Sequence, residues 1–383
     1  MPFNREVVLS MLAGLVTTMT VGVPPSRAAT PFPLQLELRV PFEPSAFPST
    51  RRTFLCYELY LTNFAGSPIN LRRLEVVDDD DKSAKPVASF EGGQLEALLQ
   101  IVGPGVAAGT SPSSLAGGST AVAFMWVSFE SGARVPKRLR HRVFTADSEG
   151  EGATIGTHHD ELKVLGPPVE GTDWRVSDGP SNDPDNHHRR GIIVVEGRPL
   201  ISRRYAIDWI EEKDGAMFSG DEHANQSYYG YGKPVLAVAN AIVVTARDGL
   251  PDNVPGYHGE QFHPAIPITP DSVAGNTITL DLGNGQFAQY AHLQPGSLRV
   301  KTGDRVRRGQ IMARIGASGD ARGPHLHFQV ANTVSTDLIA GEGVPYLIDR
   351  YRVKSLDGVS TVHTRELPLG GTLVDLVRNS VAM

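Results

Sequence analysis

Apolar and polar residues alternate over short stretches in the first half of the chain. Residues 34–40 alternate strictly, and residues 54–63 and 71–77 show a similar pattern. Residues 121–129 form a more continuous apolar run. Alternation with a period of two is typical of β-strands that bury one face. We therefore expect residues 30–165 to form an antiparallel β-sandwich of the immunoglobulin-like type.

The pattern changes after a segment rich in proline. Residues 166–185 contain four prolines together with Gly, Asp, Asn and Ser, which predicts an extended linker. Beyond it, residues 234–245 are apolar without alternation, as in a strand that is buried on both faces. We expect a second all-β domain over residues 186–350 and a short C-terminal tail over residues 351–383.

Two predicted hairpins shape the second domain. Residues 276–282 and 286–293 flank an Asn-Gly dipeptide, which favours the positive φ angles of a tight turn. Residues 191–196 and 203–209 are expected to pair around a turn near Gly197. The second pairing brings the segment just before residue 191 close to the end of the strand at residue 208.

The first residues predict a targeting signal. Arg5 precedes an apolar run over residues 7–23, and Ser26 and Ala28 are small residues that suit a cleavage site. We expect residues 1–28 to be a signal peptide and the mature protein to be secreted or periplasmic. An uncleaved membrane anchor is the alternative, although the apolar run is short for a bilayer span. After cleavage, we expect no membrane span.

Composition restricts the chemistry. The 383 residues are 40% hydrophobic and 20% charged, as in a globular protein, and the net charge of −6 argues against a nucleic-acid-binding surface. A single cysteine, Cys56, excludes an internal disulfide framework, a thiolate zinc site and an iron–sulfur cluster. We expect Cys56 to be a small buried hydrophobic residue. Any metal site must use His, Asp or Glu.

Three short segments contain the candidate chemistry. His325 and His327 are two residues apart on a predicted strand, so they share one face. His292 ends the second strand of the hairpin, and Asp208 lies among apolar residues. A buried carboxylate is costly unless it is paired or binds a metal, and the alternative partners are Arg203 or Arg204. Asp and His on different strands are what a mononuclear zinc site requires.

Together these segments resemble the M23 family of zinc metallopeptidases, the lysostaphin or LytM type. The resemblance extends over about a third of the chain. It is carried by AID at residues 206–208, GKPVLAV at 232–238, YAHL at 290–293, GDRVRRGQ at 303–310, and Gly319 with PHLHF at 324–328.

The resemblance implies a twisted antiparallel β-sheet with a metal in a groove, and a Zn²⁺-dependent endopeptidase that cuts peptide cross-bridges of bacterial peptidoglycan. It implies that Asp208 and His327 are zinc ligands and that His292 and His325 are the catalytic pair. We expect His325 to be the base, because it is nearest in sequence to His327, and the reverse assignment is the alternative. No His-Glu-x-x-His motif is present, which excludes a thermolysin-like site.

The chain departs from the family pattern at one position. The family places a third ligand, a histidine, four residues before the aspartate, and here that residue is Arg204. A guanidinium stays charged and has no lone pair to donate to a metal. We expect His188 to replace the missing ligand, because the second predicted hairpin brings it near Asp208. His187 and, less directly, His223 are alternatives.

Arg204 also supports a competing interpretation, in which the chain is a degenerate M23-like scaffold that binds or regulates without catalysis. A lipoyl- or biotinyl-type carrier is a third interpretation, but it lacks a lysine at a matching hairpin tip. Other polar groups are expected to be solvated loops and not sites. They are the acidic run at residues 78–81, the trio at residues 158–160, and His258 and His263.

Overall fold

The computed structural model describes residues 33–81, 83, 85–102, 111–256, 262–335, 337–355 and 359–376. Residues 35–383 cluster as one compact unit, which is described below. The predicted signal peptide at residues 1–28 lies outside the described residues. Within the described ranges, no helix has both the length and the apolar character that crossing a membrane requires.

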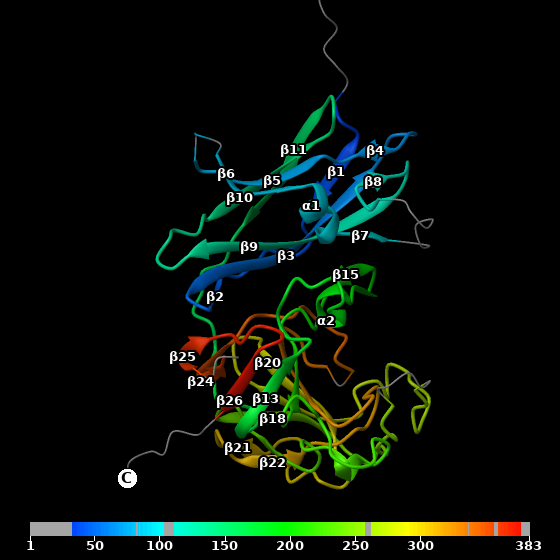
Figure 1. Ribbon diagram of the computed structural model, residues 1–383, viewed down its shortest axis with the longest axis vertical. Coiled ribbons are helices and arrows are strands. Elements are labelled where there is room, and N and C mark those ends of the chain that lie inside the picture. The colour runs from blue at the N-terminus through cyan, green and yellow to red at the C-terminus, as the bar shows by residue number, and fades with distance from the viewer. Residues whose placement is uncertain are drawn as a thin grey trace, which may run out of the picture. The chain divides into compact units, whose positions relative to one another are not determined.

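Two antiparallel sheets make up the first part of this unit (Figure 1). In one sheet the strand order is β1-β3-β9-β7, with β2 beside β3, and in the other it is β11-β10-β5-β6. These sheets agree with the predicted all-β architecture, and the immunoglobulin-like type remains a prediction. The strands are β1 (Leu36–Arg39), β2 (Phe47–Ser49), β3 (Arg52–Asn63), β5 (Arg73–Asp78), β6 (Pro86–Glu91), β7 (Leu99–Val102), β9 (Thr120–Glu130), β10 (Arg138–Phe144) and β11 (Glu149–Gly156).

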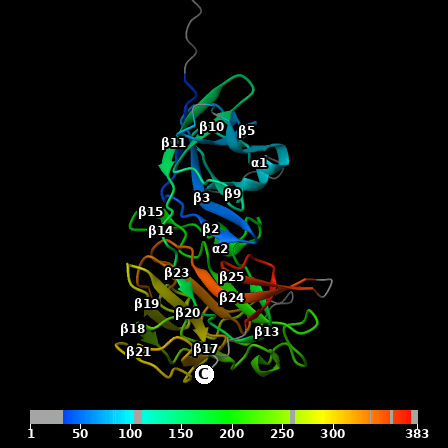
Figure 2. The ribbon, with the colours of Figure 1, turned by 90° about the vertical axis from the view of Figure 1, so that its left-hand side faces the viewer.

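An 11-stranded sheet makes up most of the rest, with the order β12-β24-β26-β13-β16-β23-β20-β19-β18-β21 and β25 beside β24. Its central strands are antiparallel, as the family resemblance predicts (Figure 2). The strands are β12 (Val164–Leu165), β13 (Gly171–Ser177), β16 (Ile207–Glu211), β18 (Ala241–Arg247), β19 (Asn276–Asp281), β20 (Phe287–Leu293), β21 (Arg305–Val306), β23 (Leu326–Ala331), β24 (Leu347–Lys354), β25 (Ser360–Glu366) and β26 (Leu373–Leu376).

Short elements connect these sheets. Among the described residues, three pairs of strands form two-stranded sheets, and three segments are helical. They are β4 (Ile69–Asn70) with β8 (Ser114–Leu115), β14 (Ile193–Val195) with β15 (Arg198–Leu200), β17 (Pro234–Leu236) with β22 (Ile311–Arg314), α1 (Gly92–Leu98), α2 (His187–Arg190) and the 3-10 turn η1 (Asn225–Ser227).

Two segments differ from the predicted organisation. The linker predicted at residues 166–185 contains β13, which pairs with β16 on one side and β26 on the other. The tail predicted from residue 351 contributes β24, β25 and β26 to the large sheet. The predicted linker has few apolar residues, but Trp174 in the linker and Val374 in the tail are both fully buried in the hydrophobic core. The four prolines lie at the two ends of the predicted linker, so the residues between them can form the strand β13.

One predicted hairpin is confirmed and the other is wrong. β19 and β20 pair around Asn284, whose φ of +58° fits the tight turn. The second hairpin turns at Gly197 as expected, where Glu196 and Gly197 both adopt positive φ angles, but residues 193–195 pair with residues 198–200 and not with residues 203–209. The strand at Asp208 therefore pairs with β13 and β23 instead.

Candidate functional site

Asp208 and His327 lie opposite each other on neighbouring strands. β16 and β23 are antiparallel, and their register pairs these two residues directly. The flanking residues Trp209 and Phe328 belong to the hydrophobic core, so the alternation of side chains turns Asp208 and His327 to the opposite face. Asp208 Oδ1 lies 2.9 Å from His327 Nδ1.

His325 and His292 lie beside this pair. His325 Nε2 is 3.6 Å from Asp208 Oδ1, and its Nδ1 is 2.9 Å from the carbonyl of Gly323. His292 has a φ of +59°, which is uncommon for a residue with a side chain. The ring centres of His292 and His325 are 4.8 Å apart. The two residues expected to be a catalytic pair are thus neighbours.

The helix α2 brings a third imidazole to Asp208. His188 Nε2 lies 3.5 Å from Asp208 Oδ2, and its Nδ1 lies 3.0 Å from the carbonyl of Asp178. Ligand atoms of His187, His188 and Asp208 all lie within 4.8 Å of one another. The side chain of His187 is 55% exposed and pairs with the Asp178 carboxylate, whereas that of His188 is 2% exposed. His188 is therefore near Asp208, although the hairpin that predicted this does not form.

Arg204 is turned away from this cluster. Its guanidinium donates to both oxygens of Glu58, to Glu342 and to the carbonyl of Gly343. It is therefore not the ion-pair partner of Asp208. Since Arg204 is buried and fully engaged elsewhere, it leaves the space around Asp208 to imidazoles.

A chain of amides fixes the tautomer of His327. Gln289 Nε2 donates to the carbonyl of Thr333, and Gln289 Oε1 accepts a hydrogen bond from Gln329 Nε2 at 2.7 Å. Gln329 Oε1 must then accept from His327 Nε2, at 2.9 Å. In the neutral ring this leaves the lone pair on Nδ1, directed at Asp208. In this tautomer the Nδ1 lone pair and the Asp208 carboxylate are two donor atoms that one cation could bind.

Hydrogen bonds also fix the tautomers of His188 and His325. Backbone carbonyls only accept, so the Nδ1 atoms of His188 and His325 carry the protons that bond to Asp178 and Gly323. Their Nε2 lone pairs point toward the carboxylate of Asp208. Imidazole nitrogens and a carboxylate oxygen are ligands that zinc prefers. The donor set present here fits a zinc ion.

Burial and mutual charge set the ionisation of the cluster. Burial by itself raises the pKa of Asp208, but His188, His325 and His327 outweigh it and hold that pKa well below its usual range. Burial lowers the pKa of His188 well below its usual value, and Asp208 offsets this only in part. Burial, followed by the charges of His325 and His327, lowers the pKa of His292 likewise. The cluster therefore favours an ionised aspartate and neutral imidazoles at His188 and His292.

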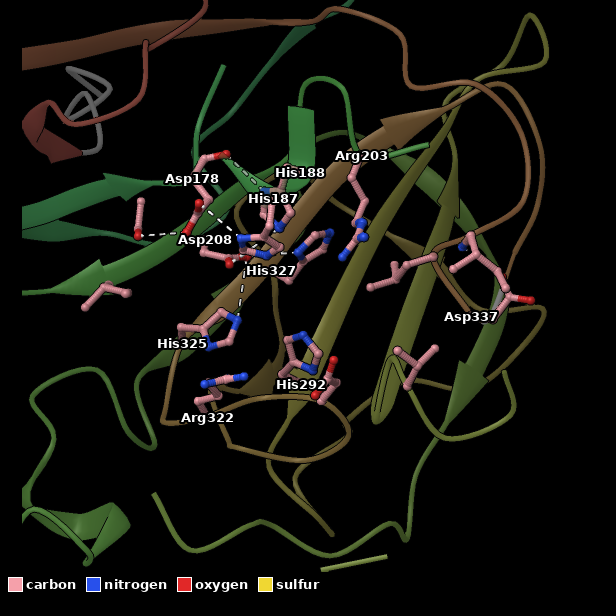
Figure 3. Close-up of a pocket in the computed structure, with 16 residues that line it drawn as sticks. Asp178, His187, His188, Arg203, Asp208, His292, Arg322, His325, His327 and Asp337 are labelled. Atoms are coloured by element: carbon pink, nitrogen blue, oxygen red, sulfur yellow. Dashed lines mark hydrogen bonds and ion pairs between the residues drawn. The ribbon is translucent and has the colours of Figure 1, made fainter. Parts of the chain in front are cut away.

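The cluster lines a cavity of about 590 Å³ (Figure 3). In Figure 3 the rings of His188, His327 and His325 surround Asp208, with His292 beyond them. Both signs of charge occur around the cavity. The charged residues outside the cluster are Asp178, Arg203, Asp320, Arg322 and Asp337, and the apolar ones are Ile210, Val273, Leu338 and Ile339.

The remaining histidines considered from the sequence are engaged elsewhere. His223 Nδ1 lies 3.2 Å from the carbonyl of Pro255, and His223 does not line the cavity. His158 pairs with Glu43. His263 is exposed, and His258 lies outside the described residues. None of the described ones contributes to the cluster around Asp208.

Several residues near the cluster were not predicted. Gln329 continues the face that His325 and His327 define, so period-two alternation is a signal that would have found it. Arg203 and Asp178 had no such signal, because one lies in a turn between strands and the other in the predicted linker. They reach the cavity only through the pairing of β13 with β16.

Part of the chain is similar to known peptidases. Residues 226–338 match the model of peptidase family M23. Glycyl-glycine endopeptidase ALE-1 of Staphylococcus capitis is 39% identical over 74 residues, which are 19% of this chain and 20% of that protein. Peptidoglycan DD-endopeptidase ShyA of Vibrio cholerae is 39% identical over 99 residues, 26% of this chain and 17% of that protein. The chain spans a fifth or less of the length of the curated relatives it matches.

Among solved structures, the catalytic domain of lysostaphin from Staphylococcus simulans matches with 23% identity and a TM-score of 0.22, covering 39% of this chain and 80% of that one. The family match includes His292, His325 and His327, and it begins after Asp208 and His188. The matched residues include β20, which contains His292, and β23, which begins directly after His325 and contains His327. Residues 226–338, which include three of the site's histidines, are thus similar to peptidase family M23.

Proposed function

We propose that this protein is an exported zinc-dependent endopeptidase that hydrolyses peptide bonds of bacterial cell-wall peptidoglycan. The observation that carries the proposal is the convergence of three imidazole lone pairs on the carboxylate of Asp208, at a cavity. The family match supports peptide hydrolysis. The printed names of its relatives, a glycyl-glycine endopeptidase and several peptidoglycan DD-endopeptidases, support a cell-wall substrate.

Asp208, His327 and His188 are the proposed zinc ligands. They come from three separate elements, β16, β23 and α2, and all three side chains are buried. Each imidazole is oriented by a second hydrogen bond, from His327 to Gln329 and from His188 to the carbonyl of Asp178. Such outer contacts are typical of metal-binding histidines. Three protein ligands leave a position for water or substrate, as catalytic zinc sites require.

His292 and His325 are the proposed catalytic pair. When bound, zinc would lower the pKa of a water molecule and polarise the scissile carbonyl. Both histidines bond to backbone carbonyls through Nδ1, His292 to Ser318 and His325 to Gly323. Each therefore presents Nε2 to the cavity and can take or return a proton at that atom. We assign the base role to His325, because its Nε2 is 3.6 Å from Asp208.

The remaining assignments extend this proposal. The cavity contains both guanidinium and carboxylate groups, which suits a peptide that bears free carboxylates and amines. Export rests on the predicted signal peptide. The division into a domain at residues 30–165 and a second one from residue 186 remains a proposal, and the second domain would also include β13, β24, β25 and β26, which belong to the large sheet.

A degenerate scaffold without catalysis is the second candidate, and Arg204 is the observation in its favour. The position of His188 weakens that candidate, because an imidazole from another element lies where the missing ligand is needed. The two candidates differ in their need for metal. The first requires zinc and all five proposed residues, whereas the second requires neither.

The full chain, loaded with zinc, can be incubated with purified peptidoglycan while the release of soluble fragments is measured. We expect release that a chelator stops and added zinc restores. Asp208→Ala should abolish release, whereas His263→Ala, a change at an exposed histidine outside the cavity, should not alter it. Release that persists in Asp208→Ala, or no release from well-folded zinc-loaded protein, would contradict the proposal.

A further inference from the structure

We propose that the N-terminal sheets are part of the metal site, because Glu58 on β3 holds Arg189 and thereby fixes His188 at Asp208. This inference rests on the proposed role of His188 as a zinc ligand. Glu58 and Arg189 are positioning residues, since neither lines the cavity. The position of His188 depends on how α2 is held in place.

The helix α2 is too short to be stable by itself. It has four residues, and a helix of this length gains few of its own hydrogen bonds. Asn186 caps it by accepting a hydrogen bond from the amide of Arg189. The remaining contacts that set its position are made by side chains to other parts of the chain. Arg189 and Arg190 make the contacts to the N-terminal part of the chain, and of these two Arg189 is the one that binds the strands β3 and β9 through hydrogen bonds.

Arg189 is fully buried, and its guanidinium is directed into the N-terminal sheet. It pairs with Glu58, and it also donates to the carbonyl of Tyr57 at 2.9 Å and of Met125 at 3.2 Å. The guanidinium carbon lies 4.8 Å from the ring centre of Phe124. These partners come from β3 and β9, more than 60 residues away along the chain. The backbone next to His188 is therefore fixed by the other sheet.

Glu58 also binds Arg204. Arg204 donates to both carboxylate oxygens, at 3.1 and 2.6 Å. Glu58 thus joins the two places at which this chain departs from the family pattern. One is the arginine at the position of the expected histidine, and the other is the helix that presents the substitute histidine. Both guanidiniums lower the pKa of Glu58 to about 2 against the effect of burial, so the carboxylate stays ionised at neutral pH.

Two variants separate positioning from general stability. Arg189→Met and Arg204→Met each remove one of the two guanidiniums that Glu58 binds, and each leaves the other. Only Arg189→Met cuts the connection to the helix of His188. Arg189→Lys is a milder change. The lysine keeps a positive charge for Glu58 but lacks the guanidinium donors that bind the carbonyls of Tyr57 and Met125.

The measurement is the zinc dissociation constant of the full chain by competition with a chromophoric chelator, with the Co²⁺ absorption spectrum as a second readout. Each variant is made alone and in combination with His188→Ala. Thermal unfolding of each metal-free variant shows whether the protein is folded before zinc is added. Loss of an outer contact of a metal ligand typically weakens binding by about 10- to 100-fold. We expect about that loss in Arg189→Met, a smaller loss in Arg189→Lys, and less than about 3-fold in Arg204→Met.

The double variants test whether the effect passes through His188. We expect Arg189→Met to weaken zinc binding no further once His188 is alanine, and to change the Co²⁺ spectrum only when His188 is present. An unchanged dissociation constant in Arg189→Met, or an equal loss with and without His188, would overturn the inference. If His188→Ala alone leaves zinc binding unchanged, the ligand assignment itself fails, and the inference fails with it.

Discussion

Asp208 Oδ1 lies 2.9 Å from His327 Nδ1, and the two residues are direct partners across β16 and β23. The register of two antiparallel strands thus determines the centre of the site. A shift of either strand by one residue would turn that strand's member of the pair into the hydrophobic core. Trp209 and Phe328, which are fully buried on the other face, therefore contribute to the position of the carboxylate and the imidazole.

Substitution of the catalytic pair should separate chemistry from metal binding. We expect His292→Ala and His325→Ala each to lower kcat by about 10²- to 10⁴-fold, because each removes a group that transfers a proton. Zinc content should stay near that of the unmodified chain. Peptidoglycan digestion and metal analysis of the same samples provide the test.

The matched variant for this pair is His188→Ala. It lies in the same cavity, but it should lose zinc together with activity. If His325→Ala lost zinc as completely as His188→Ala, then His325 would be a ligand and the roles assigned here would be wrong.

The amide chain behind His327 provides another prediction. Gln329→Leu removes the acceptor for His327 Nε2 and so releases the tautomer that directs Nδ1 toward Asp208. We expect zinc affinity to fall by about 10-fold or more, the usual effect of losing a contact to a ligand histidine. The exchange Gln329→Glu keeps an acceptor and should retain most of the affinity. Equal zinc affinity in Gln329→Leu and the unmodified chain would rule out this role.

A third prediction concerns stability in the N-terminal sheets. Burial lowers the pKa of His141 to about 4, while its Nε2 lies 2.8 Å from the hydroxyl of Tyr57. Between pH 6.5 and about 4 the unfolded chain binds a proton at this residue and the folded chain does not, so stability falls as the pH is lowered through this range. One pKa unit corresponds to about 1.4 kcal/mol, so the full loss is about 3 kcal/mol.

Urea unfolding at pH 7 and pH 5 measures this dependence. Many groups contribute to the total, so the comparison is with His141→Gln, which should lose part of the acid sensitivity. The same pH dependence in both proteins would show that His141 does not titrate as its burial indicates.

The sequence predicts the centre of the site because strand periodicity is local. His325 and His327 share a face through alternation, and the Asn-Gly turn correctly predicts the hairpin that ends near His292. The all-β architecture follows from the same period. These features depend on neighbours within about ten residues, which a single sequence displays directly.

The surroundings of His188 depend on contacts between distant parts of the chain. The hairpin around Gly197 does not bring His188 to Asp208, because its second strand ends at Leu200. The helix α2 does so instead, held by Arg189 and Glu58, which are 131 residues apart. No local pattern displays such a pair. For the same reason, β13 and β26 lie in segments that the sequence predicts to be a linker and a tail.

The central claim is that Asp208, His327 and His188 hold one zinc ion. Anomalous diffraction at the zinc absorption edge, from crystals of the zinc-loaded chain, tests it most directly. The account predicts one strong peak at about 2.0–2.2 Å from Asp208, from His327 Nδ1 and from His188 Nε2. A peak that His188 does not contact, or no peak near Asp208, would contradict it.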